Sequence, residues 1–414
     1  MLIYSIFTKI YFVLVSIAAS FNKSAAKYVK GRKGLLKKIK KAVTHNSSPI
    51  VWFHCASLGE FEQARPVMEA FRLKYPNYKI FLTFFSPSGY EVRKKYEGAD
   101  YIFYLPNDSA YHARKLVKWL KPTVVLFVKY EFWYFYLREL NRRNIPVISF
   151  SAIFRSNQLF FKPYGKLYKK ILKFFNHIFV QNEESYLLLK QAGIAEVSIS
   201  GDTRFDRVSN ICSKPVHIKV AEKFKNGEKI FVLGSVWPLD MDILIPVIND
   251  VNIRLKYIIA PHNIIDQELK AMEEKINRPC IRFSKANVTT VEKYEVLLID
   301  NIGMLSSLYQ YGEFAYIGGA FNKGLHNTLE AATFGMPLFI GAESGNMKFN
   351  EVVELEKEGA AFPVKTSSEI QKLINMLLEN ESERQKIAYT ASDYVIRHTG
   401  ATQKVLNYVD TLIQ

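Results

Sequence analysis

The chain has 414 residues, a length that favours two domains. Of these residues 49% are hydrophobic and 23% charged, a composition that excludes wholesale disorder. Its three cysteines, Cys55, Cys212 and Cys280, are too few and too scattered for a disulfide framework or a zinc cluster, which indicates a reducing compartment. The formal net charge of +17 predicts an anionic partner: nucleic acid, an acidic membrane face or phosphorylated substrates.

The N-terminal segment carries much of the positive charge. No Asp or Glu precedes Glu60, whereas ten Lys or Arg residues do. An apolar stretch at 1–21, interrupted only by Lys9, comes before nearly all of these charges. A secretory signal has the opposite order. We therefore expect an uncleaved membrane-anchor helix and a basic juxtamembrane segment over 1–45, with the rest of the chain in the cytoplasm.

Two other interpretations of this segment stay open. An interfacial helix is the close alternative, because Lys9 can snorkel to the membrane surface. A soluble amphipathic helix that covers the first domain is the other, but the basic residues at 23–41 add an attraction to anionic headgroups of about 1 kcal/mol per charge. Nucleic acid is the weaker partner, because no helix-turn-helix, RNP-like or zinc-finger pattern is present.

From residue 50 onward, short apolar runs alternate with helical patterns, which predicts parallel sheets covered by helices on both faces. In the first half we expect strands at 50–54, 79–84, 101–104, 123–128, 146–151, 177–180 and 197–200, and helices at 61–75, 110–120, 131–143 and 183–191. This alternation of strands and helices is interrupted by the polar stretch 207–226. It restarts with strands at 229–234, 257–260, 296–299, 314–317 and 336–339, and helices at 241–249, 264–276, 327–334 and 350–358. The sequence thus predicts doubly wound α/β domains at 46–208 and 227–414, joined by a linker at 209–226.

Loops that follow strands are where chemistry is expected, because ligands bind outside the carboxyl ends of the strands in such sheets and two facing domains form a cleft. The first strand runs into His54-Cys55-Ala56-Ser57-Leu58-Gly59-Glu60 and then into a helix. This turn offers free backbone N–H groups to an anion. Glu60 either caps the helix or acts as a general base at the mouth of the cleft, and the spacing favours neither interpretation.

The richest segment of the second half lies at 316–332. A strand ends at Gly318-Gly319, a loop follows, and a helix begins near His326 or Asn327, an arrangement that lets phosphate approach backbone N–H groups. Glu330 lies three residues after Asn327 and suits the two hydroxyls of a ribose. A capping box formed by the same two residues is the alternative, and the glycine-rich loop favours ligand binding. The motifs of NAD enzymes and P-loop NTPases are missing.

Four smaller loops complete this predicted pocket. Each follows a strand of the same sheet: Gly234-Ser235, Pro261-His262, Gly303-Met304-Leu305 and residues 341–346. Singly, each is more typical of an ordinary turn. Together they are successive loops at one edge of a sheet, and we expect them to surround one ligand.

The segment 52–60 reads Trp-Phe-His-Cys-Ala-Ser-Leu-Gly-Glu and resembles the aromatic-x-His-x-Ala-Ser-x-Gly-Glu motif of the 3-deoxy-D-manno-octulosonic acid (Kdo) transferases of lipopolysaccharide synthesis. Motifs at 105–108, 131–133, 181–184 and 324–330 follow in the family's order, so the resemblance covers nearly the whole chain. It implies an α/β GT-B glycosyltransferase fold, in which two doubly wound Rossmann-like domains face a central cleft, with an N-terminal membrane-anchor helix. It also implies that no metal or other cofactor is required.

The reaction that the resemblance implies is an inverting transfer of Kdo from CMP-Kdo to the tetraacyl-disaccharide lipid A precursor (lipid IVA). The reaction would take place on the cytoplasmic side of the bacterial inner membrane. Glu60 falls on the family's catalytic base. The family's CMP-binding stretches fall on Pro261, His262, Gly303, Met304, Leu305, Asn327, Thr328, Leu329 and Glu330, to which the post-strand loops add Ser235.

Three positions depart from the family's pattern. Where the family has Glu-x-Glu-x-Trp-Pro-Asn, whose first Glu helps to stabilise the transition state, this chain has Lys129 and keeps Glu131. Arg204 replaces a Lys and keeps its charge, although it is not an equivalent donor, and Pro261 replaces an Arg. We assign Glu60, Lys129, Glu131 and Arg204 to the catalytic group.

Two rival functions remain open at this point. One is another GT-B enzyme, either a lipid glycosyltransferase that uses UDP-sugars or an epimerase. The other is a non-catalytic basic protein that gathers anionic membrane lipid.

Overall fold

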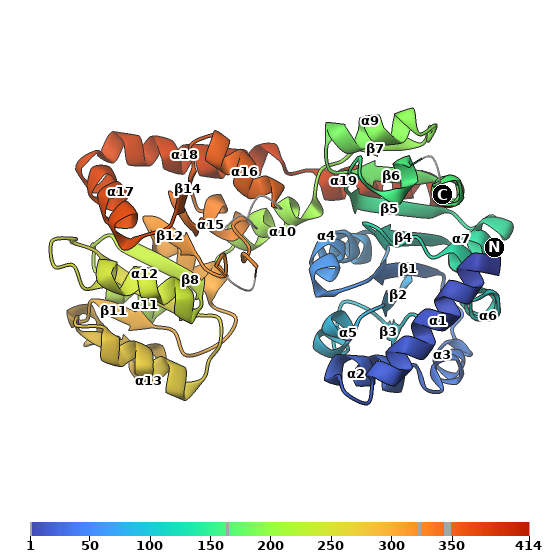
Figure 1. Ribbon diagram of the computed structural model, residues 1–414, viewed down its shortest axis with the longest axis horizontal. Helices are drawn as coiled ribbons and strands as arrows, with labels where there is room; N and C mark the ends of the chain where they lie inside the picture. The colour runs from blue at the N-terminus through green and yellow to red at the C-terminus, as the bar shows by residue number, and fades with distance from the viewer. Residues whose placement is uncertain (1, 163–164, 322–323, 343–348, 414) are drawn as a thin grey trace. The chain divides into compact units, whose positions relative to one another are not determined.

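The computed structural model describes residues 2–162, 165–321, 324–342 and 349–413 (Figure 1). The chain divides into two compact units, the first formed by Met1–Arg207 and His398–Gln414 and the second by Val208–Arg397. Each unit is built on one seven-stranded sheet, and all the strand pairs in both sheets are parallel. The predicted α/β class and the two doubly wound sheets are confirmed.

The first sheet has the strand order β3-β2-β1-β4-β5-β6-β7. Because β1 pairs with β2 on one side and with β4 on the other, the order reverses between β1 and β4. The loops after these two strands therefore meet at the topological switch point, where doubly wound sheets bind ligands. The strands are β1 (Ile50–Cys55), β2 (Lys79–Phe84), β3 (Tyr101–Tyr104), β4 (Val124–Val128), β5 (Val147–Ala152), β6 (His177–Val180) and β7 (Val197–Ile199).

Helices cover both faces of the first sheet (Figure 1). They are α1 (Leu2–Ala18), α2 (Lys23–Arg32), α3 (Leu35–Val43), α4 (Leu58–Lys74), α5 (Pro87–Arg93), α6 (Ala110–Leu120), α7 (Tyr134–Arg142), α8 (Lys166–Leu172), α9 (Glu183–Gln191), α10 (Thr203–Cys212) and α19 (Ala401–Ile413). The last residues of α10 belong to the second unit.

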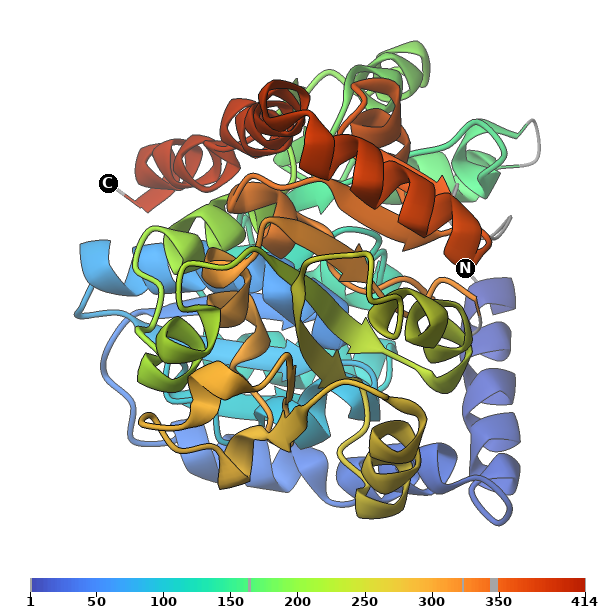
Figure 2. The ribbon, with the colours of Figure 1, turned by 90° about the vertical axis from the view of Figure 1, so that its left-hand side faces the viewer.

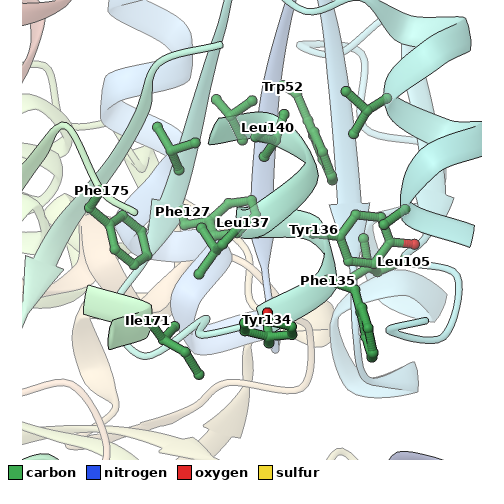
Figure 3. Packing of buried hydrophobic residues seen from close by; sticks show 14 of the residues in the cluster. Trp52, Leu105, Phe127, Tyr134, Phe135, Tyr136, Leu137, Leu140, Ile171 and Phe175 are labelled. Atoms are coloured by element: carbon green, nitrogen blue, oxygen red, sulfur yellow. The ribbon is translucent and has the colours of Figure 1, made fainter. Parts of the chain in front are cut away.

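Alternate residues of β1 enter two separate cores, as the period of a strand requires. Val51 and Phe53 join the core that α4 and α19 cover. Trp52 points to the opposite face, where its ring lies 5.7 Å from the rings of both Phe127 and Tyr136 (Figure 3). Full burial of all six residues of β1 explains why the sequence shows a continuous apolar run there.

The second sheet has the order β10-β11-β9-β8-β12-β13-β14, so its switch point lies between β8 and β12. The strands are β8 (Ile230–Val236), β9 (Lys256–Pro261), β10 (Cys280–Arg282), β11 (Val296–Leu298), β12 (Phe314–Ile317), β13 (Leu338–Gly341) and β14 (Ala361–Val364). Helices flank this sheet (Figure 2). They are α11 (Lys219–Lys225), α12 (Pro238–Ile248), α13 (Asp266–Lys275), α14 (Leu305–Leu308), α15 (Leu329–Thr333), α16 (Asn350–Lys357), α17 (Ser367–Glu379) and α18 (Glu381–Arg397).

The division of the chain differs from the sequence prediction in two ways. The end of the chain, expected in the second domain, belongs to the first unit, because Val405, Leu406 and Val409 of α19 fill the core against α4. The stretch 209–226, predicted to be a linker, contains the end of α10 and all of α11 and belongs to the second unit. Phe224 of α11 is fully buried, which explains why this polar-looking stretch is folded.

Helix α1 packs along the first unit. The hydroxyl of Tyr4 donates a hydrogen bond to Asp108 Oδ2 at 2.6 Å, and the ring of Tyr11 stacks on Phe85 at 6.4 Å. Other apolar side chains of α1 are exposed, among them Phe7 at 65% and Leu14 at 59%. Within the ranges that the structure describes, none of the helices combines the length and the apolar composition that crossing a bilayer requires.

Candidate functional site

Glu60 stands in the first turn of α4, directly after β1 and at the switch point of the first sheet. Its Oε2 atom accepts a short hydrogen bond from the backbone N–H of Ala56. Burial, and then the nearby charge of Glu131, raise the pKa of the Glu60 carboxyl to about 8. Lys129 and the backbone N–H groups of Ala56 and Ser57 act in the opposite direction. The capping interpretation holds in part, but this carboxyl can also exchange a proton near neutral pH.

Glu131 follows β4, the strand that pairs with β1. It was predicted to open a helix, but α7 begins only at Tyr134, so Glu131 lies in the loop. Its Oε2 atom is hydrogen-bonded to His54 Nε2 at 2.7 Å and accepts a second hydrogen bond from Trp133 Nε1 at 2.5 Å. Only 6% of Glu131 is exposed and His54 is fully buried. Two donor groups thus hold one buried carboxylate in a fixed position beside Glu60.

Lys129 directly follows the same strand and has a strained backbone conformation. Its φ of 56° lies in the left-handed region that favours glycine, and its N–H is held by Phe150 O at 3.0 Å. Strain of this kind persists where the surrounding structure fixes it, and it often marks functional sites. Lys129 is also the positive charge that lowers the pKa of Glu60.

Arg204 is linked to the same group through a buried carboxylate. Its Nε atom donates to Asp202 Oδ2 at 2.9 Å, and Gln63, one turn after Glu60 on α4, also donates to Asp202 at 2.9 Å. Burial would raise the pKa of Asp202, yet Arg204 and Lys129 hold it below its ordinary value. The structure therefore gathers all four residues predicted to be catalytic in the first unit.

In the second unit, the end of β8 and the turn after β12 meet closely at the switch point. A Cβ atom on Gly318 would lie 2.4 Å from Ser235 O, so only glycine allows this approach. The turns after these two strands are joined by Asp240, which was not predicted: its Oδ2 atom accepts the N–H groups of Gly319 at 2.9 Å and of Trp237 at 2.8 Å. Ser235 was predicted in the loop after the strand, but it lies within β8, where it has a left-handed φ of 54° and the pairing with β9 shifts its register.

An aromatic stack, also not predicted, lies beside this turn. The ring of His262 stacks on Trp237 at 4.2 Å and lies 4.5 Å from the ring of His326. Trp237 Nε1 donates to His326 Nε2 at 3.1 Å. Burial, and then the neighbouring His262, lower the pKa of His326 to about 4, so this ring is neutral near pH 7. Pro261, predicted with His262, is the last residue of β9.

Asn327 and Glu330 face the same side, as predicted. Asn327 Nδ2 donates to Glu330 Oε1 at 3.1 Å, while Asn327 Oδ1 accepts the N–H of Leu329 at 3.2 Å. The helix is shorter than the predicted range 327–334, because α15 has only five residues. The Leu329 side chain is fully buried, so only its backbone is available to a ligand. Thr328 is also buried, and its Oγ1 atom has no hydrogen-bond partner among the described residues.

The predicted loop with Gly303 and Met304 leads into α14, where Met304 is the N-cap residue. A Cβ atom on Gly234 would lie 3.3 Å from Leu305 Cδ1 and 2.0 Å from Tyr309 Oη, so the end of β8 packs against this helix and the residues that follow it. Burial, and then the charge of Glu330, raise the pKa of Tyr309. The segments with Ser235, Leu305 and Glu330 are therefore neighbours, as predicted. Most of the predicted loop 341–346 lies outside the described residues.

Comparison with known proteins identifies the family to which this chain belongs. The family model described as 3-deoxy-D-manno-octulosonic-acid transferase (Kdo transferase) matches residues 27–207, a range that holds Glu60, Glu131 and Arg204. The 3-deoxy-D-manno-octulosonic acid transferase of Aquifex aeolicus is 30% identical over 345 residues, which cover 82% of this chain and 88% of that protein.

Two solved structures are similar in fold. UDP-GlcNAc 2-epimerase from Neisseria meningitidis has a TM-score of 0.61 at 14% identity, over 87% of this chain and all of that one. MurG of Acinetobacter baumannii has a TM-score of 0.58 at 13% identity, over 88% of this chain and 99% of that one. These likenesses concern the fold alone. Because the sequence identity with the Aquifex protein extends over most of both chains, this chain belongs to the Kdo transferase family and is a glycosyltransferase with the GT-B fold.

Proposed function

We propose that the enzyme transfers Kdo from CMP-Kdo to the tetraacyl-disaccharide lipid A precursor, with inversion, and that Glu60 is its general base. The observation that carries this proposal is the state of Glu60: a carboxyl at the switch point of the first sheet, with a pKa raised to about 8 by burial and by Glu131. A carboxyl with this pKa is a stronger base than an exposed one and still loses its proton near neutral pH.

The reaction that follows is a single displacement. The Glu60 carboxylate removes the proton from a sugar hydroxyl of the acceptor, and the oxygen attacks the anomeric carbon of Kdo. The bond from that carbon to the phosphate oxygen of CMP breaks, and CMP leaves with the electron pair. In this proposal the guanidinium of Arg204 stabilises the negative charge that develops on the phosphate. Lys129 is a second positive charge for the anionic groups of the substrates.

The donor nucleotide is assigned to the second unit. Asn327 and Glu330 present an amide and a carboxylate on one side of the chain, a pairing that suits the two hydroxyls of a ribose. The buried Thr328 hydroxyl, which lacks a partner among the described residues, costs about 1–3 kcal/mol unless a polar group of a ligand satisfies it. Ser235 and the stack of His262 on Trp237 complete the donor site.

Helix α1 is assigned to the membrane, as an interfacial helix on the cytoplasmic face of the inner membrane. Its exposed apolar side chains stand next to the basic helices α2 and α3, a combination typical of surface-bound helices. Two adjoining hollows, of about 450 and 370 Å³, lie between α1 and the aromatic residues Phe85 and Trp133. Phe85 N donates to Cys55 O, so this apolar surface borders the turn that holds Glu60.

The decisive experiment is incubation of the purified enzyme with CMP-Kdo and the lipid A precursor, followed by mass analysis of the lipid. The proposal expects a product heavier by one or more Kdo residues and release of CMP. Competition by CMP but not by UDP would support the donor assignment. A lipid of unchanged mass, from a folded enzyme that binds CMP, would refute the proposed acceptor.

A further inference from the structure

His54 is a buried histidine whose two ring nitrogens are both engaged. It lies on β1 and faces the core opposite to that of Cys55. Its Nδ1 atom lies 2.8 Å from Thr83 Oγ1 and 3.1 Å from Thr83 O, while Nε2 contacts Glu131 at 2.7 Å. Thr83 is held in turn by Trp52 Nε1, which donates to its Oγ1 at 2.8 Å. The imidazole therefore bridges two strands of the sheet and the loop after a third.

This bridge ends on one oxygen of a carboxylate. Glu131 Oε2 contacts both His54 Nε2 and the indole N–H of Trp133, and the same N–H also lies 3.1 Å from Nε2. Hydrogen bonds to a carboxylate from two rigid rings fix its position far better than water does. A structural histidine in a core needs only one partner per nitrogen. This one directs a nitrogen at a charged group beside the proposed base.

Several charged or titratable groups face Glu60 in the first unit. They are Cys55 on β1 and Lys129, Tyr130 and Glu131 in the loop after β4. Burial, and then the charges of Glu60 and Glu131 together, raise the pKa of the Cys55 thiol, so both carboxylates lie near the same sulfur. Among these groups, only Glu131 is a second carboxylate. After burial, its charge is therefore the main influence that raises the pKa of Glu60, and the influence depends on how close the two carboxylates are held.

We propose that His54 is a positioning residue for the transfer reaction: together with Trp133 it holds the Glu131 carboxylate beside Glu60, and so sets the strength of the base. The role rests on the proposed function of Glu60. Without the clamp, Glu131 can turn toward solvent or toward Lys129, and its effect on Glu60 fades. Glu131 then serves this chain as the fixed negative charge of the site rather than as a group that touches the sugar.

The test compares pH profiles of kcat/KM with CMP-Kdo and lipid A precursor for the parent enzyme, Glu131→Gln, His54→Asn, Trp133→Phe and the double variant His54→Asn/Glu131→Gln. The acceptor's own ionisation is common to all of them, so only differences between profiles are read. Glu131→Gln removes the charge and should move the rising limb to lower pH by about one unit. His54→Asn and Trp133→Phe should move it in the same direction by less. In the double variant, His54→Asn should add nothing to the shift that Glu131→Gln produces alone.

His177→Asn is the matched control. His177 lies in the same sheet, on β6, and its Nε2 atom contacts Ser198 at 2.8 Å, away from Glu60. A substitution that merely loosens the sheet would change stability there as well, but the control profile should coincide with that of the parent. Trp133→Phe keeps an aromatic ring beside Phe85, which lies 4.7 Å from the Trp133 ring. If His54→Asn does not fold, the profile of Trp133→Phe tests the positioning of Glu131 instead.

Two results would overturn the inference. One is a rising limb that stays in place in a folded Trp133→Phe or His54→Asn enzyme. The other is an equal shift by His54→Asn with and without the Glu131 charge. Failure of the proposed function has a different signature, because Glu60→Gln would then keep near-normal turnover whatever the profiles of the other variants.

Discussion

Lys129 opposes Glu131 in setting the proton affinity of Glu60, although both residues belong to the same loop after β4. Burial and Glu131 raise the pKa of the Glu60 carboxyl, and Lys129 lowers it. Lys129 stands where the motif resemblance leads one to expect an acidic residue, so this loop carries one positive and one negative side chain. The effect of each group on the pKa of Glu60 can be measured by removing its charge.

Removal of the Lys129 charge should move the rising limb of the pH profile to higher pH. With Lys129→Met the pKa of Glu60 rises, less of the base is ionised near pH 7.5, and kcat/KM there falls. A shift of about one unit is expected for the loss of a neighbouring charge. Lys121→Met is the control, since Lys121 also has a left-handed φ, of 43°, but caps α6. A shift to lower pH would contradict the assignment.

Glu60→Gln should lower kcat by about 10²- to 10⁴-fold, the usual contribution of a general base. The amide keeps the size of the side chain but cannot accept the proton. CMP binding, measured by calorimetry, should be unchanged, because the nucleotide is assigned to the second unit. Glu69→Gln on the same helix, where Glu69 pairs with Arg65 at 2.6 Å on the surface, should leave turnover intact.

Asp240→Asn should weaken CMP binding by about tenfold or more. Asp240 Oδ2 accepts two backbone N–H groups, and Oδ1 accepts the Tyr316 hydroxyl at 2.9 Å. The amide of Asn replaces one acceptor by a donor, which leaves at least one buried group unsatisfied at a cost of about 1–3 kcal/mol. The turns after β8 and β12 then lose their common support. Asp242→Asn, exposed on the same helix, should bind CMP normally, and equal affinities for the two variants would refute this role.

Asp206→Ala should loosen the C-terminal helix. Asp206 accepts the N–H groups of Gly400 at 2.5 Å and of Thr402 at 2.7 Å, and so acts as a remote cap for α19. Loss of such a cap costs about 1–2 kcal/mol. Hydrogen exchange of peptides from α19 should speed up, while exchange in α17 stays as it is. Asp393→Ala, which removes a partly exposed ion pair with Arg397, should leave α19 unaffected.

Phe7→Ser combined with Leu14→Ser should reduce binding to vesicles of phosphatidylethanolamine with an anionic phospholipid. Each apolar side chain contributes about 1.5–3 kcal/mol when fully buried, so the bound fraction in a flotation assay should fall at least about tenfold. Because both side chains are exposed, the melting temperature should hardly change. Leu73→Ser is the control, since Leu73 on α4 is also exposed, at 85%. If flotation is unaltered, α1 is not the element that binds the membrane.

The sequence predicted all seven strands of the first sheet but missed the two edge strands of the second. The residue ranges of β2, β3, β6 and β12 were predicted without error, because each is a short apolar run flanked by turn residues. Strands β10 and β14 were not predicted. Both stand at an edge of the second sheet, β10 has only three residues, and β14 contains Pro363, which is typical of edge strands but weakens a strand pattern.

The site was predicted where it depends on chain order and missed where it depends on contacts. Glu60 comes in the first turn of the helix after β1, and Ser235 lies at the end of β8, so topology alone indicated the edge of the sheet where each belongs. Asp240 and His326 work through partners that are distant in the sequence, and no periodicity connects them. Trp237 was within reach, since it directly follows β8. The start of α15 was placed too early, because the Asn327 side chain bonds to Leu329 and Glu330 instead of beginning the helix.

The return of the chain's last helix to the first unit has a consequence for biosynthesis. The second unit is one continuous segment, Val208–Arg397, whereas the first needs residues from both ends of the chain. While the protein is on the ribosome, Val405 and Val409 emerge only after the whole of the second unit, and the apolar face of α4 that they cover stays open until then. The nascent first unit is thus exposed to chaperones for the whole time in which the second is made.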